Sequence, residues 1–356
     1  MIEDPVVVRL NAEMFPISEP ERKLLDRFGL RPIEVEEARP ERIIPHVRSA
    51  DAVCVVSTQL SAPIIDSMER CQLISRLGNG TDKIDVTRAT ERGIIVSNVP
   101  DFSTHEMAEH VMAVILSLAR EIPRMQRYMR AGAFAQARFE SFALRRLTTR
   151  TLGLIGWGDS AKAVARCAQP FGLEVIATRR NLRQSSPEAE DLGVEMMELE
   201  SLLTRADYVS LHLPLNEETR GLLNRSRLEM MKSGAVLVNA SRGEIVDEDA
   251  LADLLRSGQI RGAGVDTYGV IDIFAETELV PTHSLVTAEN VIATPHVSGL
   301  SVEANLDVAV GSVQSLASVT RGHLPHPKQI VNPEVTPIVP LKAHDPKLFE
   351  TTLGED

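Results

Sequence analysis

Two side chains in the C-terminal half of the sequence have the chemistry of a site that acts on a carbonyl compound. Arg242 follows the apolar run 234–239 and carries a forked cation that suits a carboxylate and a polarised carbonyl oxygen. His296 follows the apolar run 291–293 and comes directly after Pro295, and an imidazole can exchange a proton near neutral pH. Each has a structural alternative, because Arg242 could cap a helix and a single histidine is more often a packing residue.

A glycine-rich turn of the pattern G-x-G-x-x-A is formed by Gly156, Gly158 and Ala161. An apolar run at 152–155 precedes it, a helical pattern of small and apolar residues follows, and a second apolar run covers 173–177. In such a unit the first glycine permits a tight turn, the second admits a pyrophosphate, and the helix N-terminus offers free N–H groups to the anion. A purely structural turn is the alternative, but the strand–turn–helix–strand context favours a dinucleotide site. Its expected members are Gly156, Trp157, Gly158, Asp159, Ser160 and Thr178.

The end of the second strand decides which dinucleotide is expected. NAD-binding sites usually carry an acid there for the ribose hydroxyls, whereas this chain has Arg179 and Arg180. The two arginines could be a solvated basic pair at a strand end. In this context a contact with a 2′-phosphate is favoured, so the sequence predicts NADP(H), with NAD(H) as the other possibility.

The composition limits the class of protein. The chain has 356 residues, 43% of them hydrophobic and 25% charged, which indicates a globular protein of about two domains. Its net charge of −12 argues against nucleic acid or anionic membrane as a partner. There is no run of about eighteen apolar residues and no signal-peptide layout, so we expect a cytoplasmic protein. The three cysteines lack metal or redox spacing, no metal is expected, and Cys54 and Cys167 are expected in the core.

The elements that must position these groups alternate between strands and helices in two blocks. Strands are predicted at 5–10, 32–36, 52–57, 72–76 and 93–97, and later at 207–213, 234–239, 261–266 and 291–293. A helical pattern from about His105 leads into the second block, and another from Ser301 crosses back. The sequence therefore predicts two doubly wound α/β domains. Their expected limits are 1–103 plus 298–335 for the substrate domain, 104–297 for the cofactor domain, and 336–356 for an extended tail.

Two loops have a composition that suits binding. The glycine-broken loop 76–85 follows a predicted strand and could aim backbone N–H groups at a carboxylate, although a plain turn is equally compatible with it. The connection 266–287 is long, has little periodicity and contains the acidic stretch 274–279. Long loops in compact domains are often functional, although a solvated loop is the alternative here.

Taken together, these features resemble the D-isomer-specific 2-hydroxyacid dehydrogenases. The resemblance covers about residues 53–333 and is carried, in order, by GLIGWGDSAKAVA, VSLHLPLNEETRGLL, VNASRGEIVDEDAL, GAGVD and TPHVSG. It implies a Rossmann cofactor domain inserted into a flavodoxin-like substrate domain. It also implies hydride transfer between a nicotinamide and C2 of a 2-oxo acid or D-2-hydroxy acid, such as glyoxylate, hydroxypyruvate or a phosphoglycerate-like compound.

The resemblance assigns roles to individual residues. Arg242 would hold the carbonyl and carboxylate of the substrate, and His296 would be the general acid in reduction and the general base in oxidation. Asp266, the last residue of GAGVD, would contact the nicotinamide carboxamide. Thr104 would lie near the nicotinamide at the hinge between the domains.

A glutamate that pairs with His296 is harder to place. The family has it five residues after the aspartate of GAGVD, where this chain has Ile271, and the segment contains an insertion. Counting back from His296 leads to Glu276 or Glu278. Glu278 is preferred, because it precedes Leu-Val-Pro much as the family's acid precedes its proline.

The resemblance adds expectations about substrate and partners. Backbone at Asn79 and Gly80 would bind the substrate carboxylate, and the chain would form a homodimer through the segment near residues 105–130. The presence of both Arg242 and His296 favours an enzyme over two alternatives. These are a dinucleotide-sensing, corepressor-like binding protein on the same fold, and a structural protein with a vestigial cofactor site.

Overall fold

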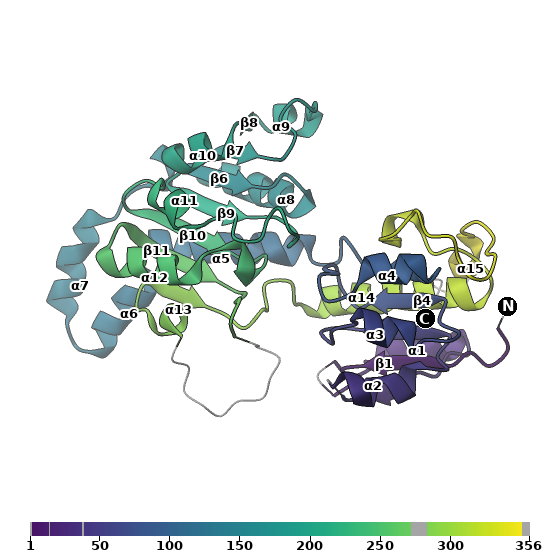
Figure 1. Cartoon of the computed structure of the whole chain (residues 1–356). Helices are drawn as coiled ribbons and strands as arrows, with labels where there is room; N and C mark the ends of the chain where they lie inside the picture. Colours follow the sequence, from purple (N-terminus) through teal and green to yellow (C-terminus); the bar gives the residue numbers. More distant parts are fainter. Residues whose placement is uncertain (1, 14, 38, 272–282, 351–356) are drawn as a thin grey trace. The chain divides into compact units, whose positions relative to one another are not determined.

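The computed structural model describes residues 2–13, 15–37, 39–271 and 283–350 and divides the chain into two compact units (Figure 1). Unit 1 consists of Met1–Phe102 and Ser301–Asp356, and unit 2 consists of Ser103–Leu300. The chain therefore passes from one unit to the other twice. No helix among the described residues is long and apolar enough to cross a membrane.

Unit 1 contains a five-stranded sheet in which every neighbouring pair is parallel and the order is β2-β1-β3-β4-β5. The strands are β1 (Val7–Leu10), β2 (Ile33–Val35), β3 (Ala52–Val55), β4 (Leu73–Arg76) and β5 (Ile95–Ser97). The helices are α1 (Glu19–Arg27), α2 (Pro40–Val47), α3 (Ala62–Asp66), α4 (Val86–Glu91), α14 (Val302–Thr320) and α15 (Lys347–Glu350). The strand order is that of flavodoxin-like folds, so the predicted fold of this domain is confirmed.

The described part of the C-terminal tail, residues 336–350, belongs to unit 1 and packs on it, in contrast to the extended tail predicted from the sequence. Ile338 N donates to Gly93 O across 3.1 Å, which ties the tail to the residues just before β5. Phe349 is only 8% exposed, and its ring centroid lies 5.6 Å from that of Phe28. The prediction of an extended tail included neither α15 nor the contact of Phe349 with Phe28 at the end of α1.

Unit 2 contains a seven-stranded parallel sheet in the order β12-β11-β10-β9-β6-β7-β8. The strands are β6 (Thr151–Ile155), β7 (Glu174–Thr178), β8 (Glu195–Met196), β9 (Tyr208–Leu211), β10 (Ala235–Asn239), β11 (Ile260–Val265) and β12 (Val291–Ala293). The chain order reverses between β6 and β9, which is the switch point at which doubly wound sheets bind ligands. The predicted Rossmann fold is confirmed, and β8 is an edge strand that was not predicted.

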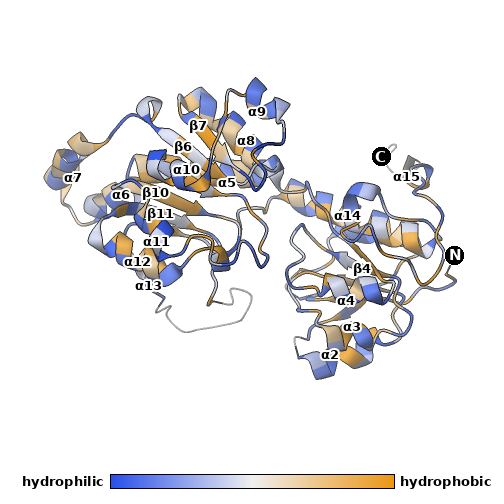
Figure 2. Ribbon diagram, turned by 45° about the horizontal axis from the view of Figure 1, so that its top comes forward, coloured by the Kyte–Doolittle hydropathy of each residue, from blue (hydrophilic) through white to orange (hydrophobic). Residues whose placement is uncertain are grey.

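Helices cover both faces of this sheet. The helices of unit 2 are α5 (Thr104–Ala119), α6 (Ile122–Arg130), α7 (Phe134–Glu140), α8 (Asp159–Ala168), α9 (Pro187–Asp191), α10 (Leu199–Arg205), α11 (Arg225–Glu229), α12 (Glu248–Ser257) and α13 (Ser284–Thr287). In Figure 2 the strands are coloured largely as hydrophobic, whereas the outer sides of the helices are largely hydrophilic. One core cluster joins α5 and α8 to the sheet, and a second joins α10, α11 and α12 to it.

The cysteines show the limit of reading burial from composition. Cys54 is buried, as predicted, but Cys167 is exposed, so that prediction was wrong. Cys167 lies on α8 between exposed Arg166 and buried Ala168. An apolar segment on a helix buries only one face, and the cysteine lies on the other.

Candidate active site

One line of paired residues crosses the sheet of unit 2 and marks where six strands end. The line runs through Thr178, Ile155, Leu211, Asn239, Val265 and Ala293, each in register with the next. Because the strands are parallel, all six end at the same edge of the sheet. The glycine turn, Arg179, Arg242, Asp266 and His296 all follow this line within three residues. The fold therefore places the unit 2 residues predicted from these strand ends along one edge of one sheet.

The glycine turn has the geometry that an anion site requires. Gly156 has φ +101°, and a Cβ there would lie 2.1 Å from the carbonyl oxygen of His212, so no other residue fits. Gly158 precedes the ten-residue helix α8, no side chain caps that helix, and a Cβ on Gly158 would meet nothing within 4 Å. The first N–H groups of α8 therefore lack a side-chain cap and have open space beside them, which fits a dinucleotide pyrophosphate.

Of the side chains in this turn, that of Trp157 is buried and that of Asp159 is exposed. The indole of Trp157 is part of the core, and its Nε1 donates to Ser186 Oγ across 2.9 Å. Any contact of Trp157 with a cofactor is therefore through its main chain. Asp159 is exposed and lies 3.3 Å from Lys162 Nζ in an ion pair one turn along α8.

His212 is a member of this site that sequence reasoning missed. Its ring is buried, with Nδ1 3.1 Å from Ser160 Oγ and Nε2 3.0 Å from Ser210 Oγ. Burial lowers the pKa of His212 to about 4, because the imidazolium would lose its hydration. The neutral ring ties the end of β9 to the first turn of α8. The available signal was its place in VSLHLPL, directly after a strand end.

The two arginines after β7 differ in their surroundings. Arg180 is exposed and forms an ion pair with Glu218, with a 2.5 Å separation. Arg179 is half-buried, and its Nε is buried without a hydrogen-bond partner among the residues that the structure describes. Of the two side chains, Arg179 is therefore the one that better fits an additional anionic group.

Arg242 lies on a loop whose backbone is fixed from two sides. Asn239 Nδ2 donates to Arg242 O across 2.8 Å, and Asn239 Oδ1 accepts from Ser241 N across 3.1 Å. A Cβ on Gly243 would lie 2.1 Å from Gly269 N, so the loop packs directly on the backbone that follows β11. The 3₁₀ turn after Arg242 has no side-chain cap bond, so Arg242 does not cap it.

The turn that carries His296 wraps around Asp266. His296 has φ +56°, in the left-handed region that residues other than glycine adopt uncommonly. Its N–H donates to Asp266 O across 2.8 Å, and the next two, of Val297 and Ser298, donate to Asp266 Oδ1 and Oδ2 across 2.9 and 3.0 Å. Asp266 is 1% exposed, so its carboxylate positions this turn. Its contact with a nicotinamide carboxamide stays a prediction.

The start of α5 lies against the same turn. Thr104 is the first residue of α5, and Ser103 precedes it without forming a side-chain cap bond. A Cβ on Gly299 would lie 2.9 Å from Ser103 Cβ, which shows how closely the two backbones approach. The segment that enters unit 2 and the segment that leaves it therefore meet beside the His296 turn.

In unit 1, Asn79 and Gly80 lie on a loop whose carbonyl groups are already bound. Asn98 Nδ2 donates to Asn79 O across 2.8 Å, and Arg76 Nε donates to Gly80 O across 2.8 Å. The N–H groups of Asn79 and Gly80 donate to no acceptor in the described part of the chain. A fixed loop with two such donors can hold a carboxylate.

The predicted acids Glu278 and Glu276 lie outside the described residues. The residues on either side of that segment are both held by Glu248 at the start of α12. Gly269 N donates to Glu248 Oε1 across 2.8 Å, and His283 Nε2 lies 3.1 Å from Glu248 Oε2.

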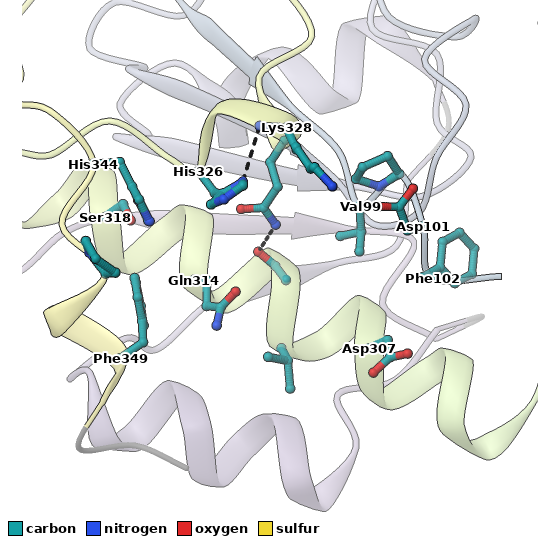
Figure 3. A pocket seen from close by; sticks show the side chains of 15 residues that line it. Val99, Asp101, Phe102, Asp307, Gln314, Ser318, His326, Lys328, His344 and Phe349 are labelled. Atoms are coloured by element: carbon teal, nitrogen blue, oxygen red, sulfur yellow. Dashed lines mark hydrogen bonds between the residues drawn. The ribbon is translucent and has the colours of Figure 1, made fainter. Parts of the chain in front are cut away.

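A cavity of about 440 Å³ lies elsewhere, in unit 1, between residues 99–102, α14 and the C-terminal tail (Figure 3). None of the residues predicted to act on substrate or cofactor lines it. Its walls combine the carboxylates of Asp101 and Asp307 with Lys328 and His326, so no single ligand chemistry stands out. The cavity is therefore separate from the predicted site residues.

Comparisons with known proteins agree with this geometry. Residues 112–298 match the family model described as "D-isomer specific 2-hydroxyacid dehydrogenase, NAD binding domain". The glyoxylate reductase of Korarchaeum cryptofilum is 35% identical over 309 residues, which are 86% of this chain and 90% of that protein. The D-3-phosphoglycerate dehydrogenase of Methanocaldococcus jannaschii is 34% identical over 314 residues, which are 87% of this chain but only 57% of that protein.

A solved structure gives the same result for the fold. The D-lactate dehydrogenase of Aquifex aeolicus, in complex with NAD and lactic acid, superimposes with a TM-score of 0.75 at 25% identity. The similarity covers 89% of this chain and 96% of that one. It therefore extends over both units.

Proposed function

Because the chain belongs to the D-isomer-specific 2-hydroxyacid dehydrogenase family, we propose that it transfers a hydride between a nicotinamide and C2 of a 2-oxo acid or D-2-hydroxy acid. One observation carries the proposal. The register Asn239–Val265–Ala293 places the loops with Arg242, Asp266 and His296 after three neighbouring strands, on the sheet whose switch point carries the glycine turn. A cation, a proton donor and a dinucleotide site are the parts that this reaction needs.

In this proposal, positively charged and N–H groups of the protein bind the negatively charged oxygens of the substrate. The forked cation of Arg242 would bind the carboxylate and the C2 oxygen. For unit 1, we propose that the N–H groups of Asn79 and Gly80 bind a carboxylate. Negative charge develops on the C2 oxygen during reduction, so the cation stabilises the transition state more than the ground state. Small 2-oxo acids of the glyoxylate and hydroxypyruvate type are the proposed substrates.

His296 would give its proton to the C2 oxygen in reduction and take it back in oxidation. The bonds to Asp266 fix the backbone from which the imidazole extends. Glu278 remains the proposed anionic partner of the imidazolium, with Glu276 as the alternative. Either carboxylate would favour the charged form of the ring.

The cofactor site fits a dinucleotide, and we propose NADP(H) as the preferred one. Bound reduced nicotinamide supplies the hydride. In this chain, the uncapped N-terminus of α8 would hold the pyrophosphate and Arg179 the 2′-phosphate. Thr178 is buried at the strand end and fixes the turn, since its carbonyl oxygen accepts from Gly156 N across 3.0 Å.

We further propose a homodimer, formed through the C-terminal part of the expected segment 105–130 and the residues that follow it. The apolar face of α5 packs inside unit 2, where Val111, Met112 and Ile115 are buried, and so it cannot also bind a second copy. Exposed apolar side chains lie instead on residues 122–142, which form α6, α7 and the turn after them and project from the body of unit 2 in Figure 1. Phe139 and Phe142 are 77% and 82% exposed. A second copy of the chain would cover these rings.

The proposed reaction is tested with glyoxylate, hydroxypyruvate and 3-phosphohydroxypyruvate, each with NADPH and with NADH. We expect oxidation of reduced dinucleotide with at least one acid, and a fall in kcat of roughly 10²–10⁴-fold in His296→Ala. Dinucleotide affinity, measured by fluorescence titration, should stay unchanged in this variant. Tight dinucleotide binding by the wild type without turnover of any of these acids would refute the reductase and support a dinucleotide-sensing protein.

A further inference from the structure

The turn that carries His296 is held by a chain of contacts that leads away from the site to helix α5. The N–H of His296 donates to the main-chain oxygen of Asp266, and the N–H groups of residues 297 and 298 donate to its two carboxylate oxygens. Successive N–H groups that surround an anion form a nest, for example where one residue is in the left-handed region. Here that residue is His296, with φ +56°. The carboxylate therefore holds the two residues that follow His296, and through them the backbone from which the imidazole extends.

Thr294 fixes that carboxylate. Its Oγ1 donates to Asp266 Oδ1 across 2.6 Å. This bond is shorter than the three bonds that the N–H groups of residues 296–298 donate to Asp266, which are 2.8, 2.9 and 3.0 Å long. The main chain of Thr294 is itself held, since its N–H donates to Val265 O across 2.9 Å and its carbonyl accepts from Tyr268 OH across 3.3 Å. The hydroxyl therefore reaches the carboxylate from a fixed backbone.

His110 on α5 completes the chain of contacts. Its Nε2 lies 3.4 Å from Thr294 Oγ1. Because the proton of that hydroxyl goes to Asp266, the oxygen can only accept from His110, so Nε2 carries the hydrogen. This bond orients the Thr294 hydroxyl so that its proton points to the carboxylate.

We propose that Thr294 and His110 are positioning residues for His296, acting through Asp266. The proposal rests on the proposed function, in which His296 exchanges the proton. Neither residue needs to touch substrate or cofactor. Their loss leaves the imidazole present but lets its turn relax, so that the proton donor is misplaced while the dinucleotide still binds.

A matched pair of substitutions isolates the hydroxyl. Thr294→Val keeps the shape and removes the donor, whereas Thr294→Ser keeps the donor. We expect kcat to fall roughly tenfold or more in Thr294→Val and to stay within about threefold of wild type in Thr294→Ser. The dinucleotide dissociation constant should change by less than about twofold in both. Equal kcat values in the two variants, or a dissociation constant that rises in step with the loss of kcat, would overturn the proposal.

His110→Phe keeps a ring on α5 and removes the N–H. Alone it should lower kcat by about threefold, since a single longer bond is lost. In a Thr294→Val background it should have no further effect, because its target hydroxyl is already absent. Multiplicative effects of the two substitutions would show that His110 acts by another route and would overturn its part in the chain of contacts.

Hydrogen exchange tests the positioning without any turnover. Amides in residues 296–298 should exchange faster in Thr294→Val than in Thr294→Ser, because the nest is loosened only in the former. Equal exchange in both variants would refute the positioning role. If the wild type reduced no 2-oxo acid, the proposed function would fail, and this measurement would still decide whether Thr294 holds the turn.

Discussion

Ser160 Oγ lies 3.1 Å from Nδ1 of His212, and this contact joins the first turn of α8 to the end of β9 beneath the glycine turn. The second ring nitrogen of His212 is 3.0 Å from Ser210 Oγ. The ring is therefore enclosed between two hydroxyls in the protein interior, where it is neutral. A proton on this ring would be a buried charge without an anionic partner among these contacts.

The unfolding free energy should consequently fall in mild acid. The pKa of His212 is lowered from 6.5 to about 4, so between these values the unfolded chain binds a proton that the folded chain excludes. As pH falls from 6.5 to 4, this group alone removes up to about 3 kcal/mol of stability. Urea unfolding at several pH values measures the loss. His212→Asn, which cannot titrate there, should show a shallower dependence, and an identical pH dependence in the two proteins would contradict the assignment.

Substitution of Arg242 should separate its charge from its shape. Arg242→Ala should lower kcat/KM by roughly 10- to 100-fold, with KM raised and kcat lowered, since the cation acts on both bound substrate and transition state. Arg242→Lys keeps the charge but not the fork, so its kcat/KM should fall between those of Arg242→Ala and the wild type. The measurement is steady-state reduction at saturating dinucleotide. Arg256→Ala, on the exposed side of α12, is the control and should be silent; unchanged kinetics in Arg242→Ala would remove this residue from the site.

Much of this arrangement follows from local sequence. Buried parallel strands are short apolar runs, and their carboxyl ends are where a doubly wound sheet binds ligands. Those two rules placed Arg242 and His296 at the edge where the structure has them. The glycine turn was equally local, because the steric demand on Gly156 arises in a strand–turn–helix unit.

What the sequence did not predict depends on contacts between distant segments. The nest around Asp266 needs N–H groups that lie about thirty residues further along the chain, and the hydrogen bond between Thr294 and His110 joins residues 184 positions apart. An isolated histidine such as His212 gives no sign of its burial. The apolar pattern of α5 predicted a buried face but not what covers it, and in this structure that face packs inside unit 2.

The exposed phenylalanines after α6 lead to a test of the dimer. Replacing both Phe139 and Phe142 with Ser should weaken self-association by at least about tenfold, because aromatic anchors dominate such interfaces. Sedimentation velocity across a micromolar concentration series measures it. Phe171→Ser, at a partly exposed phenylalanine outside residues 122–142, should leave association unchanged. A wild type that sediments as a monomer throughout would contradict the proposed homodimer.

The proposed preference for NADP(H) depends on one guanidinium. An acid after β7 would accept bonds from the ribose hydroxyls and repel a 2′-phosphate, and Arg179 reverses that charge. A charge-assisted bond to phosphate contributes about 1.5–3 kcal/mol, so kcat/KM should favour NADPH over NADH by roughly 10- to 100-fold, and less at high salt. Arg179→Asp should reverse the preference. Arg180→Ala is the matched control and should change this preference little, because that side chain is exposed and already paired with Glu218.

A guanidinium can also stack on adenine without contacting the phosphate, and in that case NADH and NADPH would have equal specificity constants in the wild type. That equality would refute the assignment of Arg179 to the 2′-phosphate.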